Sequence, residues 1–174
     1  MSLSGVVSAA AVLLVVGGAS KVRRSESAVQ ALRSVRLPAP VLVVRLLAVA
    51  EMGIGMAALA KGGRLAWLLV AVSYLGFAGF VLLAMAHGEA ISSCGCFGGP
   101  GTPPNLTHVL IALSASGLAF AAAVTRPPGP LLDGLRSDPL IAVPYVILIG
   151  CCVWFAYAAI AVLPRTASYR INGG

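Results

Sequence analysis

The sequence predicts an all-α integral membrane protein built as a bundle of transmembrane helices. Of its 174 residues, 59% are hydrophobic and 10% are charged, whereas a soluble domain carries roughly 25% charged residues. The apolar residues form five long runs, each about long enough to cross a hydrocarbon core of roughly 30 Å at about 1.5 Å per helical residue. We therefore expect a multi-pass protein of a bacterial plasma membrane, with the lipid bilayer as its first partner.

The basic residues lie between the apolar runs. The net charge is +7, from 12 Lys and Arg against 5 Asp and Glu, and no aromatic residues are interleaved with the basic ones in a patch. This pattern is typical of contacts with lipid headgroups, and we expect no nucleic-acid partner.

The first apolar run, residues 3–20, is uncharged. We expect a retained span, since a signal peptide opens with positive charge and residues 1–5 have none. Residues 21–37 carry basic side chains with apolar residues at helical spacing. That spacing favours an amphipathic helix on the membrane surface, with a solvated loop as the alternative.

The second run, residues 41–60, contains Arg45 and Glu51. Charges at membrane depth are costly enough to indicate function. Arg45 is near enough to the boundary to reach the headgroups, but Glu51 lies near the middle. We expect Glu51 either to form an ion pair or hydrogen bond with a neighbouring helix, with Lys21 as the natural partner, or to handle protons near the thiols described below.

The third run, residues 65–86, follows a tight turn at residues 61–64. Small residues in the second and third runs would let helix backbones approach closely. We expect four glycines at such packing positions: Gly53, Gly55, Gly76 and Gly79.

The fourth run is residues 106–124, and Asn105 or Thr107 could cap it, because a short oxygen side chain accepts a free backbone N–H of the first turn. A proline-rich linker, residues 125–138, separates it from the fifth run at 139–163.

The loop between the third and fourth runs contains Cys94-Gly95-Cys96-Phe97-Gly98. Glycine permits the backbone angles that let both sulfurs face one partner. A disulfide between Cys94 and Cys96 would close a very small, strained ring, and a strained disulfide is readily reduced, which suits exchange better than cross-linking. This favours a redox pair over two separately buried thiols.

Metal binding is the competing interpretation. His87 and His108 flank the two cysteines, and two thiolates with two imidazoles would suit zinc or copper. The spacing matches no particular metal signature, and each histidine alone is more typical of a membrane interface. We therefore expect neither metal nor any other cofactor.

A second pair, Cys151 and Cys152, lies near the middle of the fifth run. Half a bilayer, roughly 15 Å, would separate it from the cysteine loop. We expect these residues to act as small apolar side chains inside the membrane.

Taken together, these features resemble the MauE branch of the DoxX-like membrane proteins. The matching residues are Gly17-Gly18-Ala19-Ser20-Lys21, Leu37-Pro38, Glu51 and the string from Cys94 to Gly98. The resemblance implies a four-helix membrane domain over residues 1–124, which leaves 125–138 as a linker and 139–174 as an additional helix and tail.

The same resemblance implies a redox function. Cys94 and Cys96 become the exchanging pair of a thiol-disulfide oxidoreductase, and Lys21 and Glu51 become the polar residues beside it, with Lys21 favouring a thiolate and Glu51 taking up its proton. The implied role is to support the maturation of extracytoplasmic proteins, as in methylamine utilisation, with a thioredoxin-like or other extracytoplasmic thiol protein as partner. A non-catalytic assembly subunit is the further alternative.

Two arguments disagree on which side of the membrane the cysteine loop faces. With five spans, the face of the cysteine loop holds seven Lys and Arg and the opposite face four, so the positive-inside rule places the loop in the cytoplasm. A durable disulfide requires the outside, and we favour the outside because a surface helix can hold its arginines against the phosphates of either leaflet.

Overall fold

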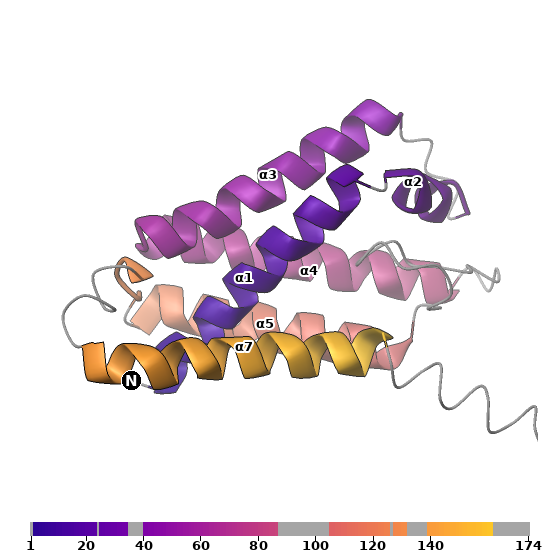
Figure 1. Ribbon diagram of the computed structural model, residues 1–174. Coiled ribbons are helices and arrows are strands. Elements are labelled where there is room, and N and C mark those ends of the chain that lie inside the picture. The colour runs from indigo at the N-terminus through magenta and orange to yellow at the C-terminus, as the bar shows by residue number, and fades with distance from the viewer. Residues whose placement is uncertain are drawn as a thin grey trace, which may run out of the picture.

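Figure 1 shows the computed structural model of the chain as a bundle of long helices. The structure describes residues 2–23, 25–34, 40–86, 105–125, 127–131 and 139–161. Within these ranges the elements are α-helices: α1 (Ser2–Arg23), α2 (Ser25–Ser34), α3 (Val41–Ala60), α4 (Arg64–Ala86), α5 (Leu106–Thr125) and α7 (Pro139–Ala161). The predicted all-α fold class is confirmed.

Four of these helices are long and apolar enough to cross a membrane, namely α1, α3, α4 and α5. In α7 the stretch Val146–Phe155 forms a shorter apolar segment. Helix α7 has 23 residues and packs against α1 and α5 (Figure 1). The structure therefore describes a multi-pass membrane bundle, and a fifth transmembrane crossing stays a prediction.

The described part of the basic segment, residues 21–23 and 25–34, is divided between two helices. Lys21 belongs to the last turn of α1, and the amphipathic helix α2 begins at Ser25. Its apolar side is buried at Val29 and Ala31, and Ala31 packs against Ala84 at the end of α4. A helix, and not a solvated loop, therefore connects the first two spans, and it covers one end of the bundle.

The bundle consists of two close pairs, α1 with α3 and α4 with α5. Small side chains let these helices approach closely, and many of the buried core residues are alanines. The main core comprises Val7, Ala11, Leu14, Ala58, Trp67, Val70, Ala71, Ala119, Ala122 and Ala123. It lies toward the end of the bundle that contains the α3–α4 turn, away from α2 (Figure 1).

The α3–α4 turn is attached to the segment that follows α5. Gly62 and Gly63 have φ angles of 65° and 88°, which other residues adopt at a cost, and a side chain on Gly62 would collide with the Pro128 carbonyl. That carbonyl accepts hydrogen bonds from the Gly63 N–H at 3.4 Å and from Trp67 Nε1 at 3.2 Å. This end of the bundle is therefore closed and tightly packed.

Of the four glycines predicted to lie where helices approach closely, one does so. A Cβ on Gly55 would lie 2.7 Å from Val15 Cγ2, so this glycine lets α1 and α3 meet. Gly18 has the same role, with the Ala48 carbonyl 2.7 Å from its Cβ position, and was not predicted. The other three glycines have nothing within 4 Å of a Cβ, so the expectation was wrong for Gly53, Gly76 and Gly79.

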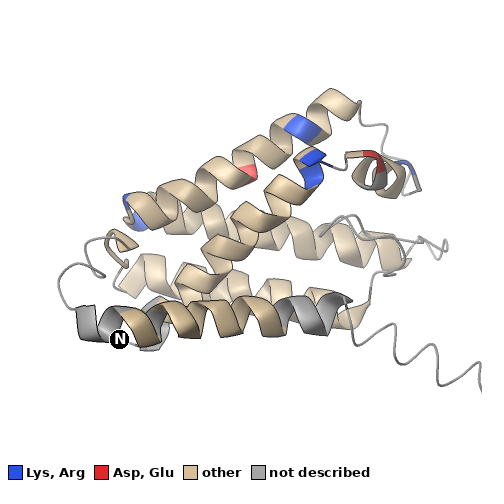
Figure 2. Ribbon diagram, in the orientation of Figure 1, with Lys and Arg blue, Asp and Glu red and all other residues tan. Residues whose placement is uncertain are grey.

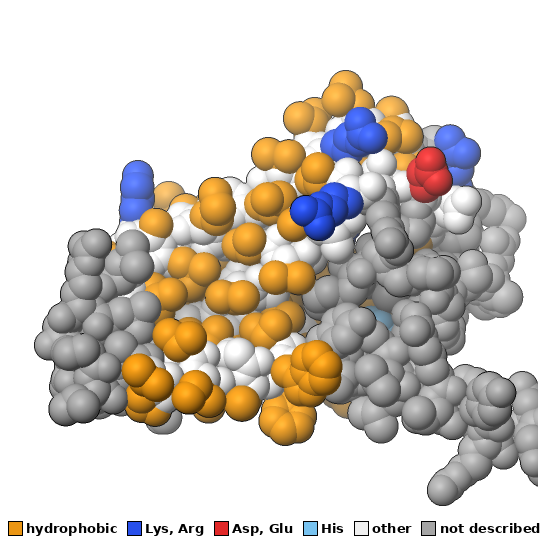
Figure 3. Space-filling model, viewed as in Figure 1, with side chains coloured by type: hydrophobic (Ala, Val, Ile, Leu, Met, Phe, Trp, Pro, Cys, Tyr) orange, Lys and Arg blue, Asp and Glu red, His pale blue; other side chains and the backbone are white. Residues whose placement is uncertain are grey.

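The outer faces of the helices are apolar. Large side chains such as Leu42, Leu65 and Val72 are 66%, 72% and 63% exposed, and Figure 3 shows hydrophobic side chains spread over the visible face. Figure 2 shows Lys and Arg mainly at helix ends and on α2. A surface of this kind is stable in a lipid bilayer, where apolar side chains face acyl chains.

Candidate functional site

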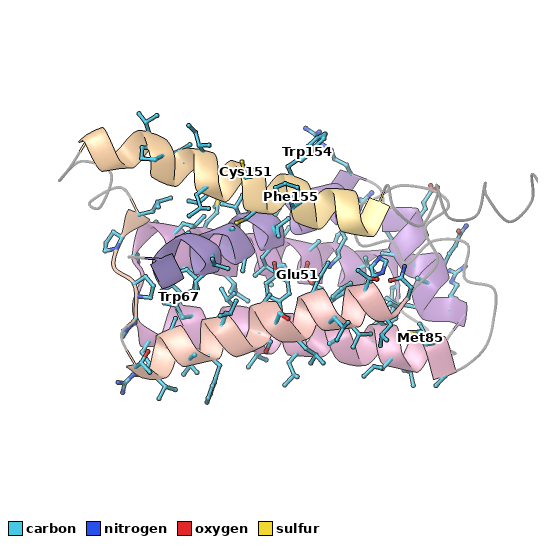
Figure 4. All side chains as sticks on the ribbon, turned by 90° about the horizontal axis from the view of Figure 1, so that it is seen from below. Glu51, Trp67, Met85, Cys151, Trp154 and Phe155 are labelled. Atoms are coloured by element: carbon cyan, nitrogen blue, oxygen red, sulfur yellow. The ribbon has the colours of Figure 1, made fainter. Side chains whose placement is uncertain are left out.

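An ion pair joins the first and second spans inside the bundle. The ammonium of Lys21, in the last turn of α1, donates to both carboxylate oxygens of Glu51, in the middle of α3, at 2.8 Å to Oε1 and 2.6 Å to Oε2. The two side chains are 17% and 13% exposed. Glu51 lies in the interior, between Trp67 and Met85 near the two ends of α4 (Figure 4). The predicted pairing of Lys21 with Glu51 is confirmed.

The surroundings of the pair compensate both charges. Lys21 Nζ also lies 6.0 Å from the centroid of the Phe77 ring, within the range of a cation–π interaction. A charge-assisted pair with both oxygens engaged is a strong interaction at low dielectric. The site therefore holds two charges at membrane depth with no net charge.

A groove opens on one side of the ion pair. Its volume is about 460 Å³, and it is lined by residues of α2, α3 and α4 together with Lys21, including Ala28, Val44, Glu51, Phe77 and Phe80. This volume falls within the roughly 300–1,000 Å³ of small-molecule sites. The walls are almost wholly apolar, so the ion pair provides the polar contact.

A second, smaller cavity also borders the pair. Its volume is about 60 Å³, and its walls come from α1, α3, α4 and α5. Four titratable side chains line it, one from each helix: Lys21, Glu51, Tyr74 and His108. Lys21 and Glu51 therefore line both the groove and this second cavity.

His108 is one of the wholly buried residues of the protein, at 0% exposure. Its backbone N–H lies 3.2 Å and its ring Nδ1 lies 2.8 Å from Asn105 Oδ1. Of the two possible caps of α5, the structure uses Asn105, while Thr107 is exposed. The expectation of an interfacial histidine was wrong because the Asn105 side chain satisfies Nδ1 and the ring does not need water on that side.

Tyr74 was missed by the sequence analysis. Its hydroxyl donates to the Ala10 carbonyl at 2.7 Å and so connects α4 to α1. A second polar bridge runs from Ser116 Oγ to the Ala71 carbonyl at 2.8 Å and connects α5 to α4. A tyrosine in the middle of a span is a usable signal, because tyrosines in membrane proteins concentrate at the interfaces.

The predicted redox pair, Cys94 and Cys96, and the predicted ligand His87 lie outside the described residues. The described flanks of their segment are Ala86, at the end of α4, and Asn105, before α5. Both flanks lie at the α2 end of the bundle (Figure 1). Within the described ranges, no group of three His, Cys, Asp or Glu could hold a metal ion, and the zinc or copper alternative stays a prediction.

The second cysteine pair lies on α7. Cys151 is exposed and Cys152 is partly buried, and both are free thiols. Figure 4 shows Cys151 on α7, at the edge of the bundle. Helix α7 turns Cys151 away from the bundle, and its expected role as a small apolar side chain inside the membrane stays a prediction.

Comparison with known proteins gives one family. The family model described as "Methylamine utilisation protein MauE" matches residues 1–126, which include α1 to α5. No curated protein and no solved structure matches the chain. Because the matched region covers more than half of the sequence and all four candidate spans, the chain belongs to the MauE family and is a multi-pass membrane protein of the group associated with methylamine utilisation.

Proposed function

We propose that this protein takes part in thiol-disulfide exchange through Cys94 and Cys96 and so supports the maturation of extracytoplasmic proteins. The observation that carries the proposal is the Cys94-Gly95-Cys96 motif in the connection between α4 and α5 of a MauE-family chain. A three-residue motif of this kind closes a strained disulfide that exchanges readily.

The position of the connection supports this role. Helix α4 ends and helix α5 begins at the same end of the bundle as α2 (Figure 1). A connection at the end of two spans lies at a membrane surface, where a water-soluble protein can reach it. The exchange needs a partner protein with two thiols, and we propose a thioredoxin-like or other extracytoplasmic thiol protein.

The exchange proceeds through a mixed disulfide. A partner thiolate attacks one sulfur of the Cys94–Cys96 disulfide, forms an intermolecular disulfide and releases the other cysteine as a thiolate. The second partner thiolate then attacks the intermolecular bond, so the partner leaves as a disulfide and Cys94 and Cys96 remain as thiols. Two electrons and two protons pass to the pair, and the reverse sequence returns them.

In the proposal, Lys21 favours the thiolate form of a loop cysteine and Glu51 takes up the proton that the thiol releases. Because both oxygens of Glu51 accept bonds from Lys21, the pair has to open before Glu51 can take up that proton. While the pair is closed, it fixes α1 against α3. In the proposal it thereby stabilises the packing of the bundle from which the cysteine connection extends.

Trapping the mixed disulfide tests the exchange. In Cys96→Ser or Cys94→Ser, the remaining cysteine can form a mixed disulfide with the partner, but no neighbouring thiolate is left in the loop to break it. We therefore expect a covalent partner adduct on non-reducing gels that disappears with reductant. The matched control is Cys151→Ser combined with Cys152→Ser, which removes two thiols and should leave the trapping of the loop variants unchanged. Absence of an adduct from both loop variants would contradict the proposal.

Labelling of whole cells tests the side and the redox state together. An impermeant thiol reagent should react with Cys94 and Cys96 in intact cells or spheroplasts after reduction, and much less before it. Equal labelling without reductant would show that the pair is not held as a disulfide, and labelling only after lysis would place it in the cytoplasm.

A further inference from the structure

One buried polar atom in the described part of the bundle has no hydrogen-bond partner, and it is His108 Nε2. The residue is 0% exposed. An unsatisfied buried polar atom is costly, so such an atom indicates either a partner that is not a protein group or a functional use. His108 lines the small cavity beside the Lys21–Glu51 pair, which gives such a partner room.

The contacts of His108 with Asn105 decide whether Nε2 donates or accepts a hydrogen bond. Asn105 Oδ1 accepts the His108 backbone N–H, which sets the orientation of the amide. The same oxygen lies 2.8 Å from Nδ1, and an amide oxygen has no proton to give, so Nδ1 carries the hydrogen. In the neutral ring Nε2 is then a bare acceptor, and its partner has to be a donor.

No donor in the cavity wall reaches His108 Nε2. The Tyr74 hydroxyl donates to the Ala10 carbonyl at 2.7 Å and the Ser73 hydroxyl to the Leu69 carbonyl at 2.8 Å. The Lys21 ammonium directs two of its three N–H groups to Glu51, and its third does not reach Nε2. A donor for Nε2 therefore has to come from an occupant of the cavity.

The volume of the cavity and the few polar atoms on its otherwise apolar wall fit water as that occupant. The cavity measures about 60 Å³, and one water needs about 10–15 Å³ of such space and two to four polar partners. His108 Nε2, the Glu51 carboxylate and the free lone pair of Tyr74 Oη provide acceptors around one small volume. Water can donate to two of them at once.

We propose that this cavity is a hydrated site in which water donates to His108 Nε2 and extends the hydrogen-bonded path to the Glu51 carboxylate. The groups that face it are Lys21 from α1, Glu51 from α3, Tyr74 from α4 and His108 from α5. This hydrogen-bonded water site does not depend on whether the cysteines exchange disulfides.

Solid-state NMR of the full chain in lipid bilayers, labelled with ¹³C and ¹⁵N in histidine and glutamate, tests this site. The sequence has two histidines, so His87→Gln leaves His108 as the single imidazole. From the hydrogen bonds to Asn105 we expect a protonated Nδ1 and a bare Nε2, and magnetisation transfer from water to both the His108 ring and the Glu51 carboxylate. A protonated Nε2, or a ring or carboxylate without water transfer, would overturn the proposal.

A pair of alanine variants on α5 gives the matched control. Ala112 is 1% exposed and lines the cavity, so Ala112→Val should fill it and reduce water transfer to His108 several-fold while Nδ1 stays protonated. Ala115 lies on the same helix outside the cavity lining, and Ala115→Val should leave the transfer unchanged. Equal magnetisation transfer from water to His108 in the wild type and in both variants would show that the water lies outside this cavity, and would contradict the proposal.

Discussion

At the scale of single residues, the protein is organised by a small number of polar groups inside an apolar bundle. Lys21 and Glu51 pair across α1 and α3, Tyr74 connects α4 to α1, and Asn105 orients His108 at the start of α5. Except at His108 Nε2, the buried hydrogen-bonding side-chain atoms of these residues are partnered within the protein, and an unsatisfied polar group inside an apolar bundle is costly.

Breaking the ion pair on one side should be more harmful than removing both charges. Lys21→Met or Glu51→Leu alone leaves an uncompensated charge in a partly buried site, which costs about 3–5 kcal/mol. The double variant should cost clearly less than the sum, as measured by unfolding of the purified protein in a double-mutant cycle. Arg45→Gln, at an exposed position of α3, is the control and should change little; strict additivity would show that the pair is not coupled.

The Tyr74 hydroxyl should contribute to stability through its bond to α1. Tyr74→Phe keeps the ring and removes the donor to the Ala10 carbonyl, so we expect a loss of about 0.5–1.5 kcal/mol in the same unfolding measurement. Ser73→Ala removes a bond within one helix and should have a smaller effect. A Phe variant as stable as the wild type would mean that this bond contributes nothing net.

At the scale of elements, the helices are held together by close approach at particular glycines. Gly55 and Gly18 lie where α1 and α3 meet, and a Cβ at either position would come within 2.7 Å of an atom of the other helix. Close backbone approach increases van der Waals contact, which drives association of helices in lipid. The α1–α3 pair therefore depends on glycine at these two positions.

Two glycines on one helix should respond in opposite directions to alanine. Gly55→Ala should destabilise the protein by about 1–3 kcal/mol through overpacking, because its Cβ meets the Ala11 carbonyl at 2.8 Å as well as Val15. Gly53→Ala has open space and should be neutral or stabilise α3 by up to about 1 kcal/mol. Thermal unfolding of both variants in the same lipid or detergent measures the difference, and equal effects would contradict the observed packing.

At the scale of the whole molecule, the two ends of the bundle differ. The α3–α4 turn is bound to Pro128 above an alanine-rich core, whereas α2, the groove and the hydrated cavity lie toward the other end. One end is therefore built for packing, and the other offers space beside charged groups. The connection that carries Cys94 and Cys96 starts from the second end.

The two ends should lie on opposite sides of the membrane. In a background without native cysteines, a cysteine at Lys61, in the α3–α4 turn, and one at Arg33, on α2, are both at exposed positions. An impermeant reagent applied to intact cells should label one of them and not the other, since the transmembrane helix α3 separates them. Labelling of both positions in intact cells would contradict a single orientation of the bundle across the bilayer. Labelling of one position in some preparations and of the other in the rest would contradict it as well.

The sequence by itself determined the fold class and the four candidate spans to within about three residues. It also predicted the Asn105 cap and the pairing of Lys21 with Glu51, each as one of two alternatives. These depend on length, composition and the scarcity of charge in apolar runs. The tertiary structure alone decided that Gly18 and Gly55 are contacts while Gly53 is not, that His108 is buried, and that Tyr74 reaches α1. Those outcomes depend on how each helix is rotated about its axis, and a helix that is apolar all round has no amphipathic stripe to reveal it.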